Sequence, residues 1–116
     1  MAYDSPRVQV LLDEDGVRAV VLSGEFDVDS VAPLQEVLAA AAREGARRVV
    51  DIAQVAFADS SLLNVLLTAH GEESLVVAGP VPKQFAELLH MSGSEDALDI
   101  APTLAEARVR ARARSA

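Results

Sequence analysis

Hydrophobic and polar residues follow two patterns along this chain of 116 residues: short aliphatic runs and longer segments with helical spacing. Residues 7–12 and 17–22 are aliphatic and β-branched runs, and the Asp-Glu-Asp-Gly sequence at 13–16 between them ends in an Asp-Gly turn signal. These residues therefore predict a β-hairpin. Further strands are predicted at 47–52, 75–78 and 97–100.

Four segments between and after these strands have the spacing and the end signals of helices. They extend from cap residues at 29–33 to Gly45, from Asp59-Ser60-Ser61 to Gly71, from Pro82 to Ser92-Gly93, and over residues 103–114. The second helix has one apolar stripe that ends at His70, and residues 53–58 before it are expected to be a connecting loop. The last helix begins with the capping-box spacing of Thr103 and Glu106.

This order of elements predicts an α/β fold with right-handed crossovers between parallel strands. The N-terminal hairpin makes the sheet mixed, and about four helices cover it. The length suits one domain over residues 1–116, of which residues 1–6 are expected to be flexible. The hydrophobic fraction of 51% against 24% charged residues is that of a chain that folds.

The formal net charge of −8 opposes binding to phosphate backbones and to anionic membranes. Four arginines, at 108, 110, 112 and 114, nevertheless crowd the C-terminal end. Arginines in the last turns of a helix suit its dipole, and a short basic tail could also touch an acidic surface. The charge thus predicts a protein that binds neither nucleic acid nor membrane directly.

The chain has no cysteine, its start lacks the apolar segment of a signal peptide, and no apolar run approaches the length of a membrane span. A cytoplasmic protein is therefore expected. Neither a Walker A sequence nor a Gly-x-Gly-x-x-Gly sequence after a strand is present, so no nucleotide cofactor is expected.

Acidic residues suggest two ion sites, and spacing argues against one of them. Asp13 and Asp15 resemble the start of a calcium loop, but the twelfth position holds Gly24 where a bidentate glutamate is needed. Glu25, Asp27 and Asp29 alternate in what is expected to be the loop after the second strand. They could bind a hard cation or a basic partner, or be a solvated loop in which Asp29 caps the first helix.

Ser60 and His70 are candidates for a Ser-His-Asp catalytic triad of a hydrolase, since such triads are defined by geometry rather than by their order in the sequence. No Gly-x-Ser-x-Gly elbow surrounds either serine, however, so an enzyme is not expected. A cap role explains one serine of the Asp59-Ser60-Ser61 sequence but not two. An exposed Ser60 could carry a phosphoryl group, which the free N–H groups of a helix start would stabilise.

Three sequence motifs, in order along the chain, resemble those of the STAS family. They are Gly-Glu-Phe-Asp at 24–27, Asp-Ile-Ala-Gln-Val-Ala-Phe-Ala-Asp-Ser-Ser at 51–61, and Met-Ser-Gly at 91–93. The chain is most similar to the free-standing members of that family, the bacterial anti-sigma-factor antagonists. The three motifs, together with the family's order of elements between them, cover nearly the whole chain.

The resemblance implies regulation of transcription by partner switching. The unphosphorylated antagonist binds an anti-sigma factor with serine kinase activity, and phosphorylation of the antagonist ends the complex. A serine phosphatase then removes the phosphate, so that the antagonist can bind again. By position the family's phosphorylated serine falls on Ser60, with Ser61 as the alternative, and Asp59 is the preceding acid. The partner surface is expected to include Glu25 and Asp27 as well.

Leu62 and Asn64 depart from the family pattern, which usually has glycine at both positions. Leu63 continues the apolar stripe, so Leu62 is expected at the rim beside Ser60, where it and Asn64 would contact a partner. The alternative function is a STAS-fold interaction module that is not phosphorylated and belongs to a larger signalling or transport assembly.

Overall fold

A computed structural model describes residues 5–113 of the chain. The elements in chain order are β1 (Arg7–Val10), β2 (Val17–Phe26), α1 (Ala32–Arg43), β3 (Arg47–Ala58), α2 (Ser60–Glu72), β4 (Leu75–Ala78), α3 (Lys83–Met91), β5 (Asp99–Ala101) and α4 (Leu104–Ala113). The expected flexibility of residues 1–6 falls largely on residues 1–4, which lie outside the described residues, as does the last residue of the helix expected at 103–114.

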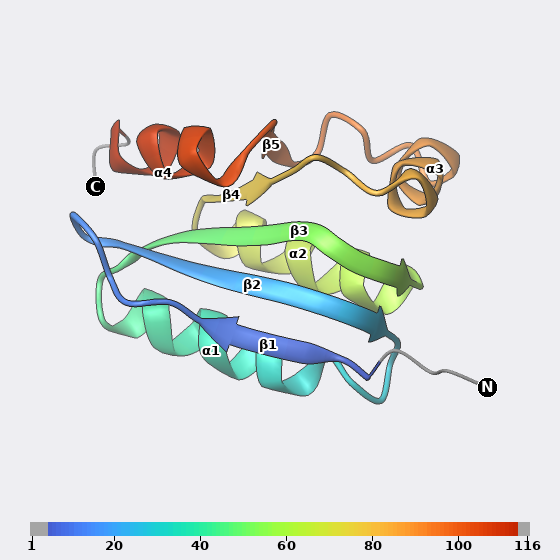
Figure 1. Ribbon diagram of the computed structural model, residues 1–116, viewed down its shortest axis with the longest axis horizontal. Coiled ribbons are helices and arrows are strands. Elements are labelled where there is room, and N and C mark those ends of the chain that lie inside the picture. The colour runs from blue at the N-terminus through green and yellow to red at the C-terminus, as the bar shows by residue number, and fades with distance from the viewer. Residues whose placement is uncertain (1–4, 114–116) are drawn as a thin grey trace.

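The five strands form one sheet in the order β1-β2-β3-β4-β5 (Figure 1). β1 pairs antiparallel with β2, and the other neighbouring strands pair in parallel. The predicted Asp-Gly turn joins β1 to β2: Asp15 and Gly16 both have positive φ, and the Glu14 and Val17 backbones exchange hydrogen bonds of 2.9 and 3.0 Å. The α/β fold class with a mixed, mostly parallel sheet is thus confirmed.

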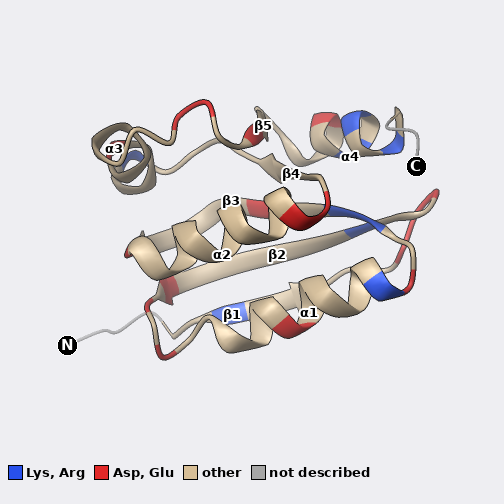
Figure 2. Cartoon of the chain, turned by 180° about the vertical axis from the view of Figure 1, so that it is seen from behind, with Lys and Arg blue, Asp and Glu red and all other residues tan. Residues whose placement is uncertain are grey.

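Helices cover both faces of the sheet, and each face buries its own hydrophobic cluster. The larger cluster lies beneath α1, α2 and α3 and includes Phe26, Leu34 and Phe85. The smaller cluster includes Ala107 and Ala111 of α4, whose small side chains let this helix approach the strands closely. α1 and α2 therefore lie side by side on one face, and α4 lies on the other (Figures 1 and 2).

Two strands extend beyond their predicted ends. β2 continues to Phe26, and β3 continues to Ala58 through residues 53–58, where a loop was expected. The loop prediction is wrong because β3 pairs with residues 23–26 of β2, with register shifts on either side of Gly24. Pairing supplies the backbone with partners that the weak apolar pattern of this segment does not indicate.

Caps at the helix starts agree only in part with the sequence. The Glu106 N–H donates to Thr103 Oγ1 at 3.1 Å, as the capping-box spacing predicts. α1, in contrast, has Val31 as its N-cap and no side-chain cap, so the expected capping by Asp29 is wrong. α2 continues one residue past Gly71, to Glu72.

The arginines of α4 form ion pairs with acids of the same chain. Arg110 contacts Asp99 at 2.6 Å, and Arg112 contacts Asp15 at 3.2 Å in the hairpin turn. Arg108 lies 3.9 Å from Glu14. Arg110 and Arg112 lie in the last turn of α4, where they also suit the helix dipole, and Arg114 lies outside the described residues.

Candidate functional site

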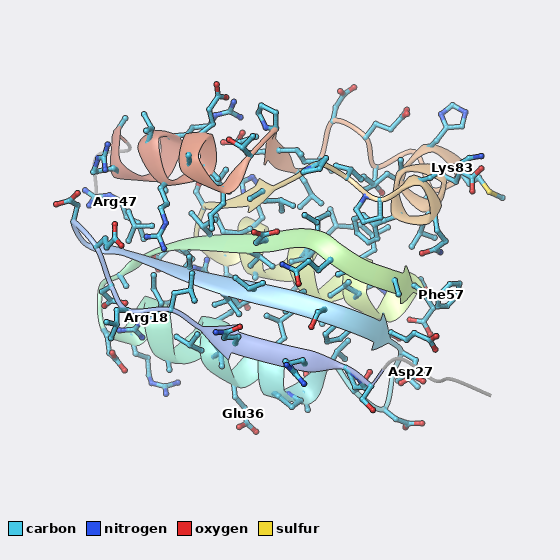
Figure 3. The ribbon with its side chains drawn as sticks, viewed as in Figure 1. Arg18, Asp27, Glu36, Arg47, Phe57 and Lys83 are labelled. Atoms are coloured by element: carbon cyan, nitrogen blue, oxygen red, sulfur yellow. The ribbon has the colours of Figure 1, made fainter. Side chains whose placement is uncertain are left out.

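The sequence motifs meet where β2 and β3 end and α2 begins. Register pairs Glu25 with Phe57 and Phe26 with Ala58, and the Asp59 N–H donates to the Phe26 carbonyl at 3.2 Å. Parallel pairing thus brings the two carboxyl ends to one edge of the molecule. Figure 3 shows Asp27 and Phe57 at this end, with Lys83 of α3 on the same side.

Asp59 is the N-cap of α2. Its backbone is extended, with φ −96° and ψ −172°, and its carboxylate Oδ1 accepts the Ser61 N–H at 2.8 Å. The acid rather than a serine therefore caps this helix. The expectation that a cap role explains one of the two serines is therefore wrong, because the Asp59 carboxylate takes that role.

The two serines differ in exposure. Ser60 is exposed in the first position of α2, and no hydrogen bond to its hydroxyl is found within residues 5–113. Ser61 is half-buried, and its N–H is the one that Asp59 holds. The Ser60 hydroxyl is thus the more accessible nucleophile of the pair.

Gln84 of α3 fixes the backbone directly before the Asp59 cap. Its side-chain Oε1 accepts the Ala58 N–H at 2.9 Å, and its Nε2 donates to the Ala58 carbonyl at 2.8 Å. The amide side chain completes the hydrogen bonding of β3 beyond the end of β4, as a neighbouring strand would. Sequence reasoning missed Gln84, since no local pattern marks a glutamine that reaches another element.

The turn after β2 is held by its own side chains. Asp27 N–H donates to Ser30 Oγ at 2.9 Å, and the Asp29 N–H donates to Asp27 Oδ1 at 2.9 Å. Asp27 and Asp29 are exposed, whereas Glu25 is half-buried within β2 rather than in a loop. The expected loop position of Glu25 is therefore wrong, because β2 continues through it.

Leu62 is fully buried, with 0% of its surface exposed, and belongs to the larger cluster. The expected rim position of Leu62 is wrong, and with it the expected contact between this side chain and a partner. Leu63 is buried as well, so the apolar stripe of α2 is wide enough for both leucines. Asn64 is exposed, as expected of a residue that faces away from the core.

Phe57 supplies the apolar surface that Leu62 does not. Its side chain is 47% exposed at the end of β3, two residues before Asp59. It belongs to the sequence motif at 51–61, but the loop expected there gave no reason to select it. Aromatic residues such as phenylalanine are enriched at surfaces that bind another protein.

The histidines take no part in this site. The His70 Nδ1 accepts the Leu75 N–H at 3.1 Å, in the last turns of α2 and about 15 Å along the helix from Ser60. His90 lies on α3 and contacts Glu95 at 3.1 Å. A triad of Ser60 and His70 is therefore excluded by distance.

The acids of the site do not converge on a point. Within residues 5–113, no group of three or more histidine or acidic side chains is placed to hold a metal ion. The same residues contain no helix long and apolar enough to cross a membrane. The site can thus offer an exposed hydroxyl, exposed carboxylates and one aromatic ring.

Comparisons with known proteins match nearly the whole chain. The family described as "Mlab, STAS domain" matches residues 10–113. No curated protein matches in sequence. An anti-sigma factor antagonist from Mycobacterium paratuberculosis has a similar crystal structure, with a TM-score of 0.78, 27% identity, and coverage of 96% of this chain and 97% of that one.

Two structures of SpoIIAA are also similar. The unphosphorylated form of this anti-sigma factor antagonist has a TM-score of 0.75 at 20% identity, over 95% of this chain and 100% of that one. The phosphorylated form, from Bacillus, has a TM-score of 0.67 at 22% identity, over 90% and 98% of the two chains. At these identities the likeness concerns the fold alone.

Proposed function

Because the chain belongs to the STAS domain family, we propose that it is an anti-sigma-factor antagonist, which acts by binding an anti-sigma factor in the cytoplasm rather than by catalysis. The mycobacterial antagonist supports this proposal, since it matches over nearly the full length of both chains. The partner is an anti-sigma factor with serine kinase activity. It phosphorylates the antagonist and so ends the complex, and a serine phosphatase restores it.

The exposed hydroxyl of Ser60 carries this proposal. Ser60 directly follows the Asp59 cap, and its hydroxyl is free for phosphoryl transfer. The first turn of a helix has N–H groups without helical partners, and only that of Ser61 is taken by Asp59. A phosphate on Ser60 would add about −1.5 to −2 charges and would be stabilised by the others.

The partner surface proposed here surrounds Ser60. It consists of Asp59, Ser61 and Asn64 next to it, Glu25 and Asp27 at the end of β2, and Phe57 at the end of β3. When a partner covers this surface, a phosphate on Ser60 would lose its water and would be repelled by the carboxylates around it. Phosphorylation therefore acts at the interface, and the domain stays folded.

Incubation with ATP and candidate anti-sigma factor kinases, followed by intact mass measurement and peptide mapping, tests the proposal. We expect one phosphoryl group on wild-type protein and on Ser61→Ala, and none on Ser60→Ala. Ser60→Ala should bind the kinase constitutively, because it cannot be released. Phosphate found only on Ser61 would overturn the assignment.

A second function is favoured by the residues that replace the family's glycines. Asn64 is exposed at one of these positions, where glycine would let a partner's backbone approach closely, whereas Leu62 at the other is buried in the core. A STAS-fold interaction module that is never phosphorylated, within a larger signalling or transport assembly, fits this departure. Stable binding to a partner without kinase activity, unchanged by Ser60→Asp, would favour it.

A further inference from the structure

A groove with a volume of about 520 Å³ runs between α1 and α2, on the helical face of the sheet. Figure 2 shows the two helices side by side on this face. Buried side chains line the bottom of the groove, among them Leu38, Val65 and Ala69. We call it the α1–α2 groove.

Exposed polar side chains form the walls of the α1–α2 groove. Gln35 stands on α1, and Asn64 and Thr68 stand on α2. Ser61 lines one end of the groove, and this end therefore lies next to Ser60. From Ser61 to Glu73 the groove is about 18 Å long, at about 1.5 Å per helical residue.

The end of the groove away from Ser60 has a buried arginine and two exposed acids. Arg48 is 3% exposed and donates to the carbonyls of Leu38 at 3.4 Å, Ala69 at 3.1 Å and Glu73. Burial lowers the pKa of its guanidinium, while Glu73 and Glu72 oppose that effect. These hydrogen bonds hold the guanidinium against α1 and the end of α2, and its charge offsets part of the charge of the two glutamates.

Glu72 and Glu73 are then the charges that this end of the groove offers to solvent. Arg43, in the last turn of α1, does not line the groove. An apolar floor with polar walls suits an amphipathic segment, as when a helix binds in a groove. The acidic end suits a lysine or arginine on that segment.

We propose that the α1–α2 groove receives an amphipathic segment of the partner protein, with its basic residues at the end where Glu72 and Glu73 lie. The inference deepens the proposed function, on which it rests for the identity of the partner. The basic residues would lie about 18 Å from the end of the groove next to Ser60, which is farther than the electrostatic screening length of about 8 Å at physiological salt. A phosphate on Ser60 would therefore not attract them.

Site-specific photo-crosslinking tests the groove directly. A benzoylphenylalanine replaces the exposed Thr68 in the groove wall, and a second variant carries it at the exposed Ala105 on α4 as the control. Both full-length variants are irradiated in native cell lysate, and the linked peptides are sequenced. We expect the Thr68 position alone to capture a segment of another protein that bears lysine or arginine.

The acids provide the second arm of this experiment. Glu72→Gln with Glu73→Gln should lower the crosslinking yield from Thr68 about fivefold, the scale of two exposed ion pairs, whereas Glu36→Gln on α1 should not. A linked second copy of this chain, a linked small molecule or a segment without basic residues would overturn the proposal. Equal yields from the Thr68 and Ala105 positions, or an unchanged yield without the acids, would do so too.

The two proposals can fail separately. Phosphorylation of Ser60 by a kinase that is never captured from the Thr68 position would refute the groove and leave the proposed function standing. Capture of a basic segment of an anti-sigma factor that puts no phosphate on Ser60 would refute the proposed phosphorylation switch and leave the groove standing.

Discussion

Asp59 serves α2 in two ways, since its carboxylate caps the helix and its charge lies beside Ser60. The two contributions can be separated, because asparagine caps a helix about as well as aspartate but carries no charge. We expect Asp59→Asn to melt near the wild-type temperature and Asp59→Ala to lose about 1 kcal/mol, or about 4 °C. Thermal denaturation followed by circular dichroism measures both.

Binding of the partner then shows what the charge of Asp59 does. If the charge contributes to the interface, Asp59→Asn weakens the complex without changing the melting temperature. Equal stability of Asp59→Asn and Asp59→Ala would mean that the hydrogen bond to Ser61 has no stabilising effect.

Leu62 and Asn64 replace glycines of the same motif, but the structure assigns them different environments. Leu62 is in the core, so Leu62→Ala should cost about 2–5 kcal/mol in the free energy of unfolding. Asn64→Gly, at an exposed helix position, should cost less than about 1 kcal/mol. Urea denaturation of the two variants compares them, and a stability loss of similar size in both would contradict the burial of Leu62.

Among the elements, the hairpin turn and the end of α1 are joined through Arg18 of β2. Its guanidinium donates to Asp13 at 2.8 and 2.9 Å and to Glu44, just past α1, at 2.8 Å. The hydrogen bond from Arg18 lowers the pKa of Asp13, and the two acids raise that of Arg18. Because the folded-state pKa of Asp13 is lowered, its stabilising effect is fully present above the ordinary pKa of about 3.9.

That stabilisation is lost as the pH falls through the lowered pKa of the folded state. We expect Arg18→Gln to return the pKa of Asp13 to its ordinary value, measured by a carboxyl NMR titration, and Arg7→Gln in β1 to leave it lowered. An Asp13 titration that Arg18→Gln does not move would show that the ion pair does not form in solution.

At the scale of the whole molecule, a switch without unfolding requires that charge at Ser60 leave the fold intact. Ser60 is exposed at the start of α2, and a negative charge there suits the helix dipole. Ser60→Asp should therefore melt cooperatively within a few degrees of wild type, the scale of about 1 kcal/mol, while binding to the partner is lost. Calorimetry measures both, and loss of cooperative melting would refute local action.

Features whose physical causes lie within a few consecutive residues could be predicted from the amino-acid sequence. The Asp-Gly turn at 15–16, the strand at 75–78 and the cap at Thr103 depend on local backbone preferences and on short hydrogen bonds. The motif around Ser60 could also be recognised in the sequence, because its residues are nearly consecutive. Local patterns of this kind sufficed for the fold class, and the resemblance to a family motif selected Ser60 as the candidate serine.

Features that depend on contacts between residues far apart in the chain could not be predicted from local patterns. β3 continues to Ala58 because β2 pairs with it and Gln84 completes its hydrogen bonds from 26 positions away. Leu62 is buried because β2, α1, β3, β4 and α3 all contribute side chains to the same cluster, and the helical spacing of α2 alone does not indicate this. Hydrophobic spacing describes one face of one element, whereas burial and pairing depend on which other elements cover it.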